Sequence, residues 1–265
     1  MEINKIHLMD AIKGMKQLNE NSIDFVIADP PYNLSKGANL NWSGNIKDMG
    51  FGGKWIKTME KWDDIPLIKY AEFTYLWLSE VKRILKPTGS FWIFGTYHNI
   101  GIVNFTLQIL EMEMLNEIIW FKRNSFPNLS GRRFTASHET IIWGHTGSAK
   151  KRDYYFNYDY TKETKFPEDL IKQENKQMRS VWDIPNNKKK DELAFGKHPT
   201  QKPIRIIERM ISSSTKEDWI GLIPFAGAGT ECVACLKNNR KFIGFEIEEE
   251  YINIANKRIA NIGLS

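Results

Sequence analysis

The sequence has little cysteine, no long apolar run and no apolar leader. Only two cysteines occur in 265 residues, which is too few for a disulfide framework, so a reducing cytoplasm is the expected compartment. No stretch approaches the roughly 18 consecutive apolar residues of a membrane helix, and the start, MEINKIHLMD, lacks the apolar segment of a signal peptide. Hydrophobic residues make up 42% and charged residues 26%. These values exclude a disordered or collagen-like chain and predict an ordinary globular protein.

Several common site motifs are also missing. No Gly-Lys-Ser/Thr follows a glycine turn, which excludes a P-loop. The turn at 224–230 (PFAGAGT) lacks the third glycine of the dinucleotide pattern and lies too near the end of the sequence for such a domain. Cys232 and Cys235 form a C-x-x-C, but the five histidines are scattered, so no metal site is expected. The His138-Glu139 pair suggests acid–base work, although Glu139 is expected to order local structure.

The apolar periodicity predicts an α/β fold. Strands are expected at 23–28, 90–94, 115–121, 138–145, 219–223 and 241–245. Helices are expected at 66–86, 100–111, 203–214, 228–238 and 248–260. Such alternation predicts a mainly parallel sheet flanked by helices. Two regions without clear periodicity, about 33–64 and 147–197, are expected to be a long loop and an inserted, largely irregular region.

The glycine turn suggests a nucleotide-like ligand. Gly227 and Gly229 join a predicted strand to a predicted helix, where the backbone can approach a ligand and helix N–H groups can bind it. Glu246 ends the next predicted strand, where a carboxylate can accept bonds from both ribose hydroxyls. With a dinucleotide and a P-loop disfavoured, S-adenosylmethionine is the common ligand that remains for this geometry.

A second turn suggests base chemistry. Asp29-Pro30-Pro31-Tyr32 follows a buried strand, and its prolines fix the backbone and remove two N–H donors. An exocyclic base amine is a poor nucleophile, because its lone pair is delocalised into the ring until acceptors bind its hydrogens. The Asp29 carboxylate and the Pro30 carbonyl are candidate acceptors, and Tyr32 is a candidate to stack on a base flipped out of the duplex. The alternative is a strand-ending turn with a packed tyrosine.

Positive charge is concentrated in one stretch. Residues 118–152 contain seven basic residues and one acid, an excess larger than the net charge of +5 of the whole chain. Aromatic residues are interleaved with them, and cations beside rings are typical of a nucleic-acid surface. The alternative is a solvated charged face over an aromatic core. The candidate DNA-binding residues are Lys122, Arg123, Arg132, Arg133, Lys150, Lys151 and Arg152.

Three motifs together resemble a known family. DPPY at 29–32, KHPTQKP at 197–203 and PFAGAGT at 224–230 look like the motifs of the β-class DNA amino-methyltransferases of restriction–modification systems. Residues 155–182 are similar to the methylases of MboII- and DpnII-type systems. The resemblance implies a permuted methyltransferase fold with a mainly parallel, seven-stranded-type sheet. It also implies S-adenosylmethionine as cofactor without a metal, double-stranded DNA as partner and a homodimer. The likeness to DpnII-type enzymes suggests GATC as the recognition sequence.

The resemblance also implies roles for single residues. Asp29, Pro30 and Tyr32 match the catalytic motif, and aspartate in its first position is typical of adenine-N6 enzymes, whereas cytosine-N4 enzymes usually carry serine. The cofactor-binding matches are Asp10, Ala11, Thr200, Lys202, Phe225, Gly227, Gly229, Thr230 and Glu246. Residues 1–144 are expected to form a catalytic half with a mobile loop at 33–64. Residues 145–196 are expected to be an inserted target-recognition region, and 197–265 a cofactor-binding half that completes one α/β domain with 1–144.

One position departs from the family. Relatives usually carry Asp-Pro-Phe before the glycine turn, whereas this chain has Ile223-Pro224-Phe225. The missing carboxylate normally lies near the methionine group of the cofactor, so weaker cofactor binding is expected. The expected function is transfer of a methyl group from S-adenosylmethionine to N6 of a flipped-out adenine in a specific DNA sequence. The alternatives are a cytosine-N4 methyltransferase on the same scaffold and a catalytically weakened DNA-binding homologue.

Overall fold

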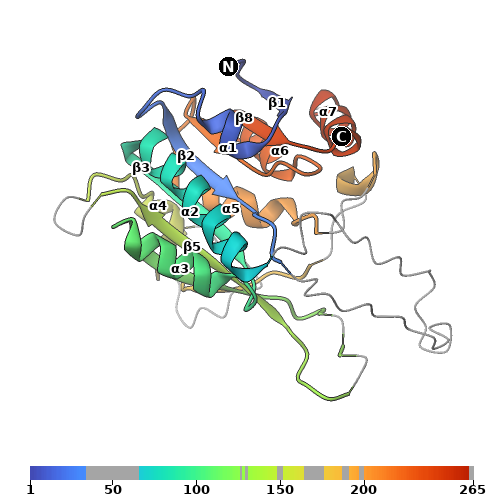
Figure 1. Cartoon of the computed structure of the whole chain (residues 1–265). Helices are drawn as coiled ribbons and strands as arrows, with labels where there is room; N and C mark the ends of the chain where they lie inside the picture. Colours follow the sequence, from blue (N-terminus) through green and yellow to red (C-terminus); the bar gives the residue numbers. More distant parts are fainter. Residues whose placement is uncertain are drawn as a thin grey trace.

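A computed structural model describes residues 1–33, 66–125, 127–128, 131–147, 152–163, 176–186, 191–196 and 200–262. Within these residues one sheet has the strand order β1-β8-β7-β2-β3-β5-β4-β6 (Figure 1). The strands are β1 (Lys5–Leu8), β2 (Ile23–Ala28), β3 (Leu85–Gly95), β4 (Glu113–Phe121), β5 (His138–His145), β6 (Val181–Asp183), β7 (Ile220–Ile223) and β8 (Lys241–Glu246). The helices are α1 (Ala11–Met15), α2 (Leu67–Ile84), α3 (Ile100–Ile109), α4 (Tyr158–Glu163), α5 (Ile204–Ser214), α6 (Thr230–Lys237) and α7 (Glu249–Ala260).

The strand directions bring many strand ends to one edge of the sheet. All pairings are parallel except β3 with β5 and β4 with β5, which confirms the predicted mainly parallel sheet. Because β5 runs against its neighbours, its amino end lies beside the carboxyl end of β3, where Thr140 pairs with Gly95. The amino end of β5 therefore meets the carboxyl ends of the parallel strands at the same edge.

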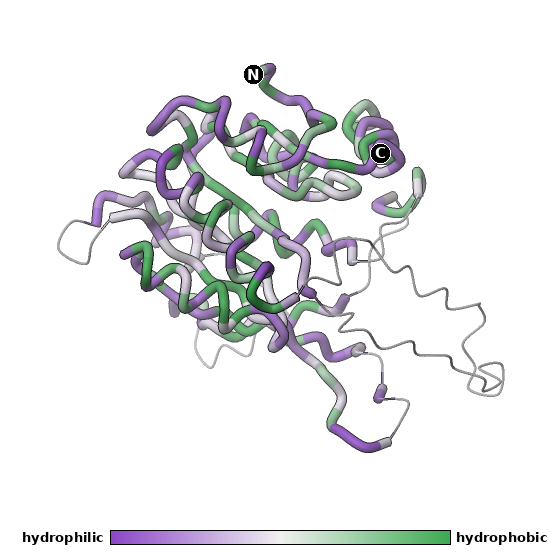
Figure 2. Tube along the Cα trace, viewed as in Figure 1, coloured by the Kyte–Doolittle hydropathy of each residue, from purple (hydrophilic) through white to green (hydrophobic). Residues whose placement is uncertain are grey.

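Helices cover both faces of the sheet. Helices α1, α2 and α3 pack on one face through apolar residues such as Met15, Trp77 and Val103. Helices α5, α6 and α7 pack on the other face, where the buried thiols of Cys232 and Cys235 belong to the core. The central strand β2 is buried along its whole length and hydrophobic over most of it (Figure 2). No helix in the described ranges has both the length and the apolarity to cross a membrane.

The structure contains every helix and strand that the periodicity predicts, with ends moved by a few residues. It adds four short helices and strands, β1, α1, α4 and β6. Strand β1 lies at the sheet edge with a single buried residue, Ile6, and β6 has three residues, so neither carries a readable period. Strand β6 pairs with β4, so part of the region expected to be irregular completes the sheet. Most of the expected loop at 33–64 lies outside the described residues.

Candidate active site

The candidate site is built at the sheet edge where the strand ends meet. Asp29 directly follows β2, the glycine turn at 224–230 follows β7, and Glu246 ends β8. Glu139 is the second residue of β5, and Lys122 directly follows β4. Both residues therefore lie at the same edge of the sheet. A crevice outside the carboxyl ends of the strands is the usual ligand position in open α/β sheets.

Helix α2 anchors the Asp-Pro-Pro-Tyr turn. The Tyr70 hydroxyl donates to the Pro31 carbonyl oxygen at 2.6 Å, and the Asn99 side-chain amide donates to the Tyr70 hydroxyl at 3.2 Å. Tyr70 and Asn99 are both fully enclosed, with 1% and 0% exposure. The turn therefore has a fixed position, with the Pro31 carbonyl directed into the protein.

Asp29 lies in a buried ion pair with Lys202. The Lys202 ammonium donates to Asp29 Oδ2 at 2.6 Å, and the Tyr32 hydroxyl donates to Asp29 Oδ1 at 2.5 Å. Lys202 also lies 5.1 Å from the ring centres of Tyr32 and Phe94. The family resemblance suggested Lys202 for the methionine end of a cofactor, and the structure places its ammonium on Asp29.

A second carboxylate, Glu139, belongs to the same cluster. Its Oε1 accepts from the Lys122 ammonium at 2.9 Å, and its Oε2 lies 3.3 Å from the Tyr32 hydroxyl and 3.8 Å from Lys202 Nζ. The sequence carries a weak signal for this residue, an acid beside a histidine at the start of a strand. Only the antiparallel course of β5 brings Glu139 next to a turn that lies far away in the sequence.

The charges in this cluster fix one another. Burial raises the pKa of Asp29, and the Lys202 ammonium opposes that shift without cancelling it. Burial alone would lower the pKa of Lys202, but the carboxylates of Asp29 and Glu139 outweigh it, so the pKa of Lys202 is raised. Burial would also raise the pKa of Glu139, yet Lys202 and Lys122 leave it below its ordinary value. Two ammonium groups thus hold two carboxylates in a largely buried cluster.

The glycine turn has the backbone that close approach requires. Gly227 and Gly229 have φ values of 46° and 74°, in the left-handed region that favours glycine. A Cβ atom on Gly229 would lie 2.7 Å from the Cβ atom of Ala255 on α7, so the helix packs against the turn. The Gly227 N–H donates to Glu246 Oε2 at 2.7 Å, and Glu246 Oε1 accepts from two further backbone N–H groups. Glu246 therefore ties the end of β8 to the glycine turn.

The other expected cofactor residues surround this turn. The Asp10 side chain accepts from Lys13 N–H at 2.9 Å and so caps α1. Ala11 follows it and is buried, and the preceding Met9 N–H donates to the Glu246 carbonyl at 2.8 Å. These contacts bring Asp10 and Ala11 to the end of β8.

Three more of these residues have structural partners. The Phe225 ring makes an edge contact with Trp77 of α2 at 5.7 Å between ring centres. The Thr230 hydroxyl is bonded by the Arg258 guanidinium at 3.0 Å. The Thr200 carbonyl accepts from Lys202 at 3.2 Å, so the segment before α5 connects to the Asp29 cluster.

Glu231 is a buried acid that the sequence does not single out. It is 5% exposed and lies in the first turn of α6, where an acid is commonly a favourable charge at a helix start. Burial raises the pKa of Glu231 to about 7, and the negative charge of Asp29 acts in the same direction. Ile223, the position that departs from the family, is 0% exposed and packs in the core on the α5–α6 face.

The basic stretch divides between two ends of the sheet. Arg123 forms a two-point contact with Asp183, and Lys122 belongs to the buried cluster. Arg152 binds Glu113, which pairs with His145 at the far end of β5 from Glu139. Arg132 and Arg133 are exposed on the segment that leads into β5, and Lys150 and Lys151 lie outside the described residues. Among the described residues, the candidate DNA-binding cations therefore do not form one continuous face.

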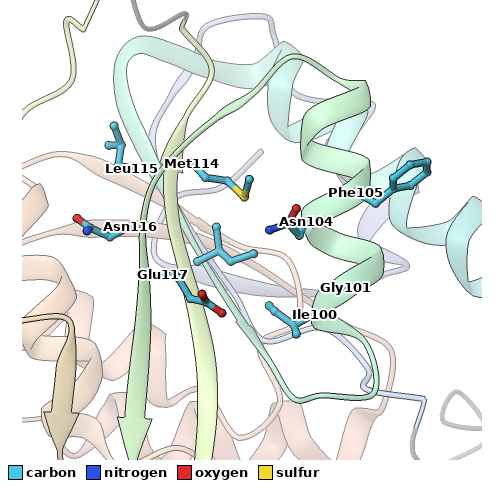
Figure 3. Close-up of a pocket in the computed structure, with 9 residues that line it drawn as sticks. Ile100, Gly101, Asn104, Phe105, Met114, Leu115, Asn116 and Glu117 are labelled. Atoms are coloured by element: carbon cyan, nitrogen blue, oxygen red, sulfur yellow. The ribbon is translucent and has the colours of Figure 1, made fainter.

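A cavity of about 360 Å³ lies between α3 and β4 (Figure 3). It is lined by Ile100, Gly101, Asn104, Phe105, Met114, Leu115, Asn116, Glu117 and Ile142. None of these residues belongs to the Asp29 cluster or to the glycine turn. The cavity is therefore separate from the candidate active site.

Known proteins resemble the chain over nearly its whole length. It is 40% identical over 259 residues to the Type II methyltransferase M2.DpnII of Streptococcus pneumoniae, covering 97% of this chain and 90% of that protein. It is 40% identical to M2.LlaDCHI of Lactococcus lactis subsp. cremoris, covering 94% and 87%. It is 36% identical to M.HinfI of Haemophilus influenzae, covering 98% and 69%.

Solved structures share the fold. The complex of M1.HpyAVI with SAM superposes with a TM-score of 0.61 at 26% identity, covering 96% of this chain and 98% of that one. The cytosine-N4-specific PvuII DNA methyltransferase has a TM-score of 0.72, covering 98% and 87%, and at 18% identity this likeness concerns the fold alone. The DNA methylase family matches residues 23–257. Together with the Type II methyltransferase relatives, this match shows that the chain belongs to the family of DNA methylases.

Proposed function

We propose that this protein transfers a methyl group from S-adenosylmethionine to N6 of an adenine that is flipped out of a specific double-stranded DNA sequence. The buried Asp29–Lys202 ion pair at the Asp-Pro-Pro-Tyr turn is the observation that carries the proposal. Family membership makes DNA the substrate class, and aspartate in the first position of the turn favours adenine over cytosine.

The residues of the site can hold and activate an amine. An entering adenine amine finds its acceptor in Asp29, which first gives up its bond to the Tyr32 hydroxyl. The Lys202 ammonium favours the ionised form of Asp29, in which the carboxylate can accept an N–H bond from the amine and receive the proton that the nitrogen loses. Tyr32, the aromatic residue of the motif, is the candidate to stack on the base, and its ring centre lies 5.1 Å from the Lys202 ammonium. Positioning supplies much of the rate, because little other chemistry is needed from the protein.

The glycine turn fits the cofactor. The left-handed Gly227 and Gly229 permit close approach, and the Glu246 carboxylate at the end of β8 is available to ribose hydroxyls. Asp10 and Ala11, at the end of the neighbouring β1, suit the adenine end, and Thr200 suits the amino-acid end. When bound there, S-adenosylmethionine supplies an electrophilic methyl group on a sulfonium. The SAM complex of M1.HpyAVI supports this assignment.

DNA contacts are proposed at the rim of the same edge. Arg132 and Arg133 are exposed, and between them and β5 lies Phe134, whose side chain is 99% exposed. Cations beside an exposed ring suit phosphate contact and base stacking. Residues 145–196 are proposed as the target-recognition region, with phosphate contacts from Lys150 and Lys151, whereas Arg152 binds Glu113 at the opposite end of the sheet and is not proposed for this rim.

One experiment separates this proposal from its alternatives. The purified protein is incubated with DNA and S-adenosylmethionine that carries a labelled methyl group, and the nucleosides are then analysed by mass spectrometry. N6-methyladenine is the expected product. N4-methylcytosine would support the runner-up enzyme, and DNA binding without methyl transfer would support the weakened homologue. Single-molecule sequencing of DNA from an expressing host reports the modified base and its sequence together.

A homodimer is also proposed, on the strength of the family resemblance. Phe105, which lines the cavity in Figure 3, is 64% exposed, and Ile109 on the same helix is 55% exposed; both are first candidates for the contact. Sedimentation of the wild type and of Phe105→Ser tests this assignment. A wild-type protein that sediments as a monomer at all concentrations would overturn it.

A further inference from the structure

Most acidic side chains around the candidate site are already engaged. Asp29 binds Lys202 and Tyr32, and Glu139 binds Lys122. Glu246 accepts three backbone N–H groups, and Asp10 caps α1. None of these four carboxylates lacks a strong donor.

Glu231 differs from them. It is 5% exposed and its carboxylate accepts a hydrogen bond from its own backbone N–H, but in the described part of the chain no hydrogen bond or ion pair joins it to another side chain. The nearby Arg258 guanidinium instead donates to the Ala228 carbonyl at 2.6 Å and to the Thr230 hydroxyl at 3.0 Å. The charges of Lys202 and Arg258 favour the ionised form of Glu231 but do not offset its burial, so a further cation at this position would stabilise the carboxylate.

The place of Glu231 indicates what it meets. It lies two residues after Gly229, in the first turn of α6. Three charged groups from other elements act on it: Asp29 after β2, Lys202 before α5 and Arg258 on α7. Glu231 therefore lies beside the glycine turn and near the charges of the Asp29 cluster. In the proposed function, the amino-acid part and the sulfonium of the cofactor fit between these two features.

We propose that the Glu231 carboxylate binds the α-ammonium group of S-adenosylmethionine. The inference rests on the proposed function, because it takes this cofactor as the ligand. An ammonium group offers three N–H donors and forms strong charged hydrogen bonds with a carboxylate. The sulfonium has no such donor and must face the target amine. Ile223 leaves the end of β7 without an acid, and Glu231 supplies the negative charge from the next element.

Protonation of Glu231 then couples to cofactor binding. With a pKa of about 7, raised by burial and by Asp29, part of the free protein carries a neutral Glu231 at neutral pH. A bound ammonium favours the ionised form, so binding releases a proton near neutrality and ceases to do so at higher pH. Cys232 and Cys235 on the same helix have pKa values raised by burial and stay protonated over this range.

Calorimetry of cofactor binding tests the proposal. Glu231→Gln is compared with the wild type and with Glu249→Gln, a matched change at an exposed acid on α7. At about pH 7.5, Glu231→Gln should weaken S-adenosylmethionine binding about 10-fold or more, the scale of a charged hydrogen bond. Glu249→Gln should leave it unchanged. The desamino analogue of the cofactor should bind the wild type and Glu231→Gln equally.

The outcomes separate this inference from the proposed function. Wild-type binding of S-adenosylmethionine with no loss in Glu231→Gln would overturn the inference and leave the proposed function standing. No binding to the wild type would overturn both. An equal loss for the cofactor and its desamino analogue would show that Glu231 shapes the pocket and does not bind the ammonium.

A second measurement does not depend on how well the variant folds. Wild-type titrations in buffers of different ionisation enthalpy should show proton release at about pH 6.5 that fades by about pH 8.5. Binding without proton release at the lower pH would overturn the proposal. Where Glu231→Gln folds, its melting temperature without cofactor should exceed that of the wild type more at about pH 8 than at about pH 5, because ionisation of Glu231 destabilises the wild type as pH rises through the folded pKa.

Discussion

Lys202 and Asp29 are 173 residues apart in the chain, and their side chains form a 2.6 Å ion pair. The pair joins the turn after β2 to the segment before α5, and these two elements carry two of the motifs that resemble the family. Because both side chains are largely buried, the pair is sensitive to the loss of either member. The predictions for the site begin from this relationship.

Asp29→Ala should abolish methylation and leave cofactor binding largely intact. In the proposed function Asp29 faces the target amine, whereas the glycine turn and Glu246 hold the adenosine part. A loss of about 10³-fold or more in single-turnover rate is expected, with calorimetry to show retained binding. Asp218→Ala, which changes an 84% exposed aspartate before β7, is the control. Turnover of Asp29→Ala within about tenfold of the wild type would remove Asp29 from the catalytic role.

Lys202→Met should shift the pH dependence of methylation. The Lys202 ammonium lowers the pKa of Asp29 against the effect of burial, so its loss raises that pKa further. The acid limb of the kcat/KM profile should then move to higher pH, with activity partly recovered under alkaline conditions. Lys202→Arg keeps the charge and should shift the limb less. A Met variant with an unshifted profile would show that Lys202 does not control the ionisation of Asp29.

Glu246→Ala should weaken S-adenosylmethionine binding by about 1–3 kcal/mol, the scale of hydrogen bonds to a charged group. The loss has two sources, because Glu246 is available to the ribose and also holds the Gly227 N–H at 2.7 Å. Glu248→Ala, at an exposed residue of the same loop, is the matched control. Calorimetry that finds equal affinity in both variants would mean that the ribose is held elsewhere.

Ile223→Asp introduces the carboxylate that relatives usually carry at this position, and its effect on stability shows whether Ile223 is a core residue. Ile223 is 0% exposed and packs in the core, so a carboxylate there should lower the free energy of unfolding by about 3 kcal/mol or more. Ile223→Val should lower it by only about 1 kcal/mol. Urea denaturation measures both. A folded Asp variant that binds S-adenosylmethionine more tightly would instead place Ile223 beside the cofactor's ammonium group and count against Glu231.

Phe134 and its neighbouring arginines should contribute to DNA binding in different ways. Phe134→Ala should weaken DNA binding by about 1–3 kcal/mol through lost stacking, with the salt dependence unchanged. Arg132→Ala should weaken binding to all sequences and reduce the slope of log K against log salt by about 1. Fluorescence anisotropy at several salt concentrations separates the two. Wild-type affinity in both variants would exclude this segment from the DNA surface.

The sequence by itself determined the fold class and the two turns of the site. Apolar period and turn chemistry are local properties, so β2, α2, α5 and the helices after the glycine turn can be predicted from neighbours in the chain. The Asp-Pro-Pro-Tyr turn and the glycine turn are likewise contiguous, and their residue types carry their own chemistry. The short elements β1, α1 and β6 were not predictable, because their stability comes from pairing and packing with distant residues.

Only the tertiary structure decided which charges meet. Glu139 reaches Tyr32 because β5 runs antiparallel to β3, and the sequence contains no pattern that states this direction. The same course carries Arg152 to the opposite end of the sheet, so a basic stretch that is continuous in the sequence divides in space. Glu231 appears as an ordinary helix-start acid until burial and the nearby Asp29 change its pKa. Burial, desolvation and pairing between charges are properties of neighbours in space, and the fold alone determines them.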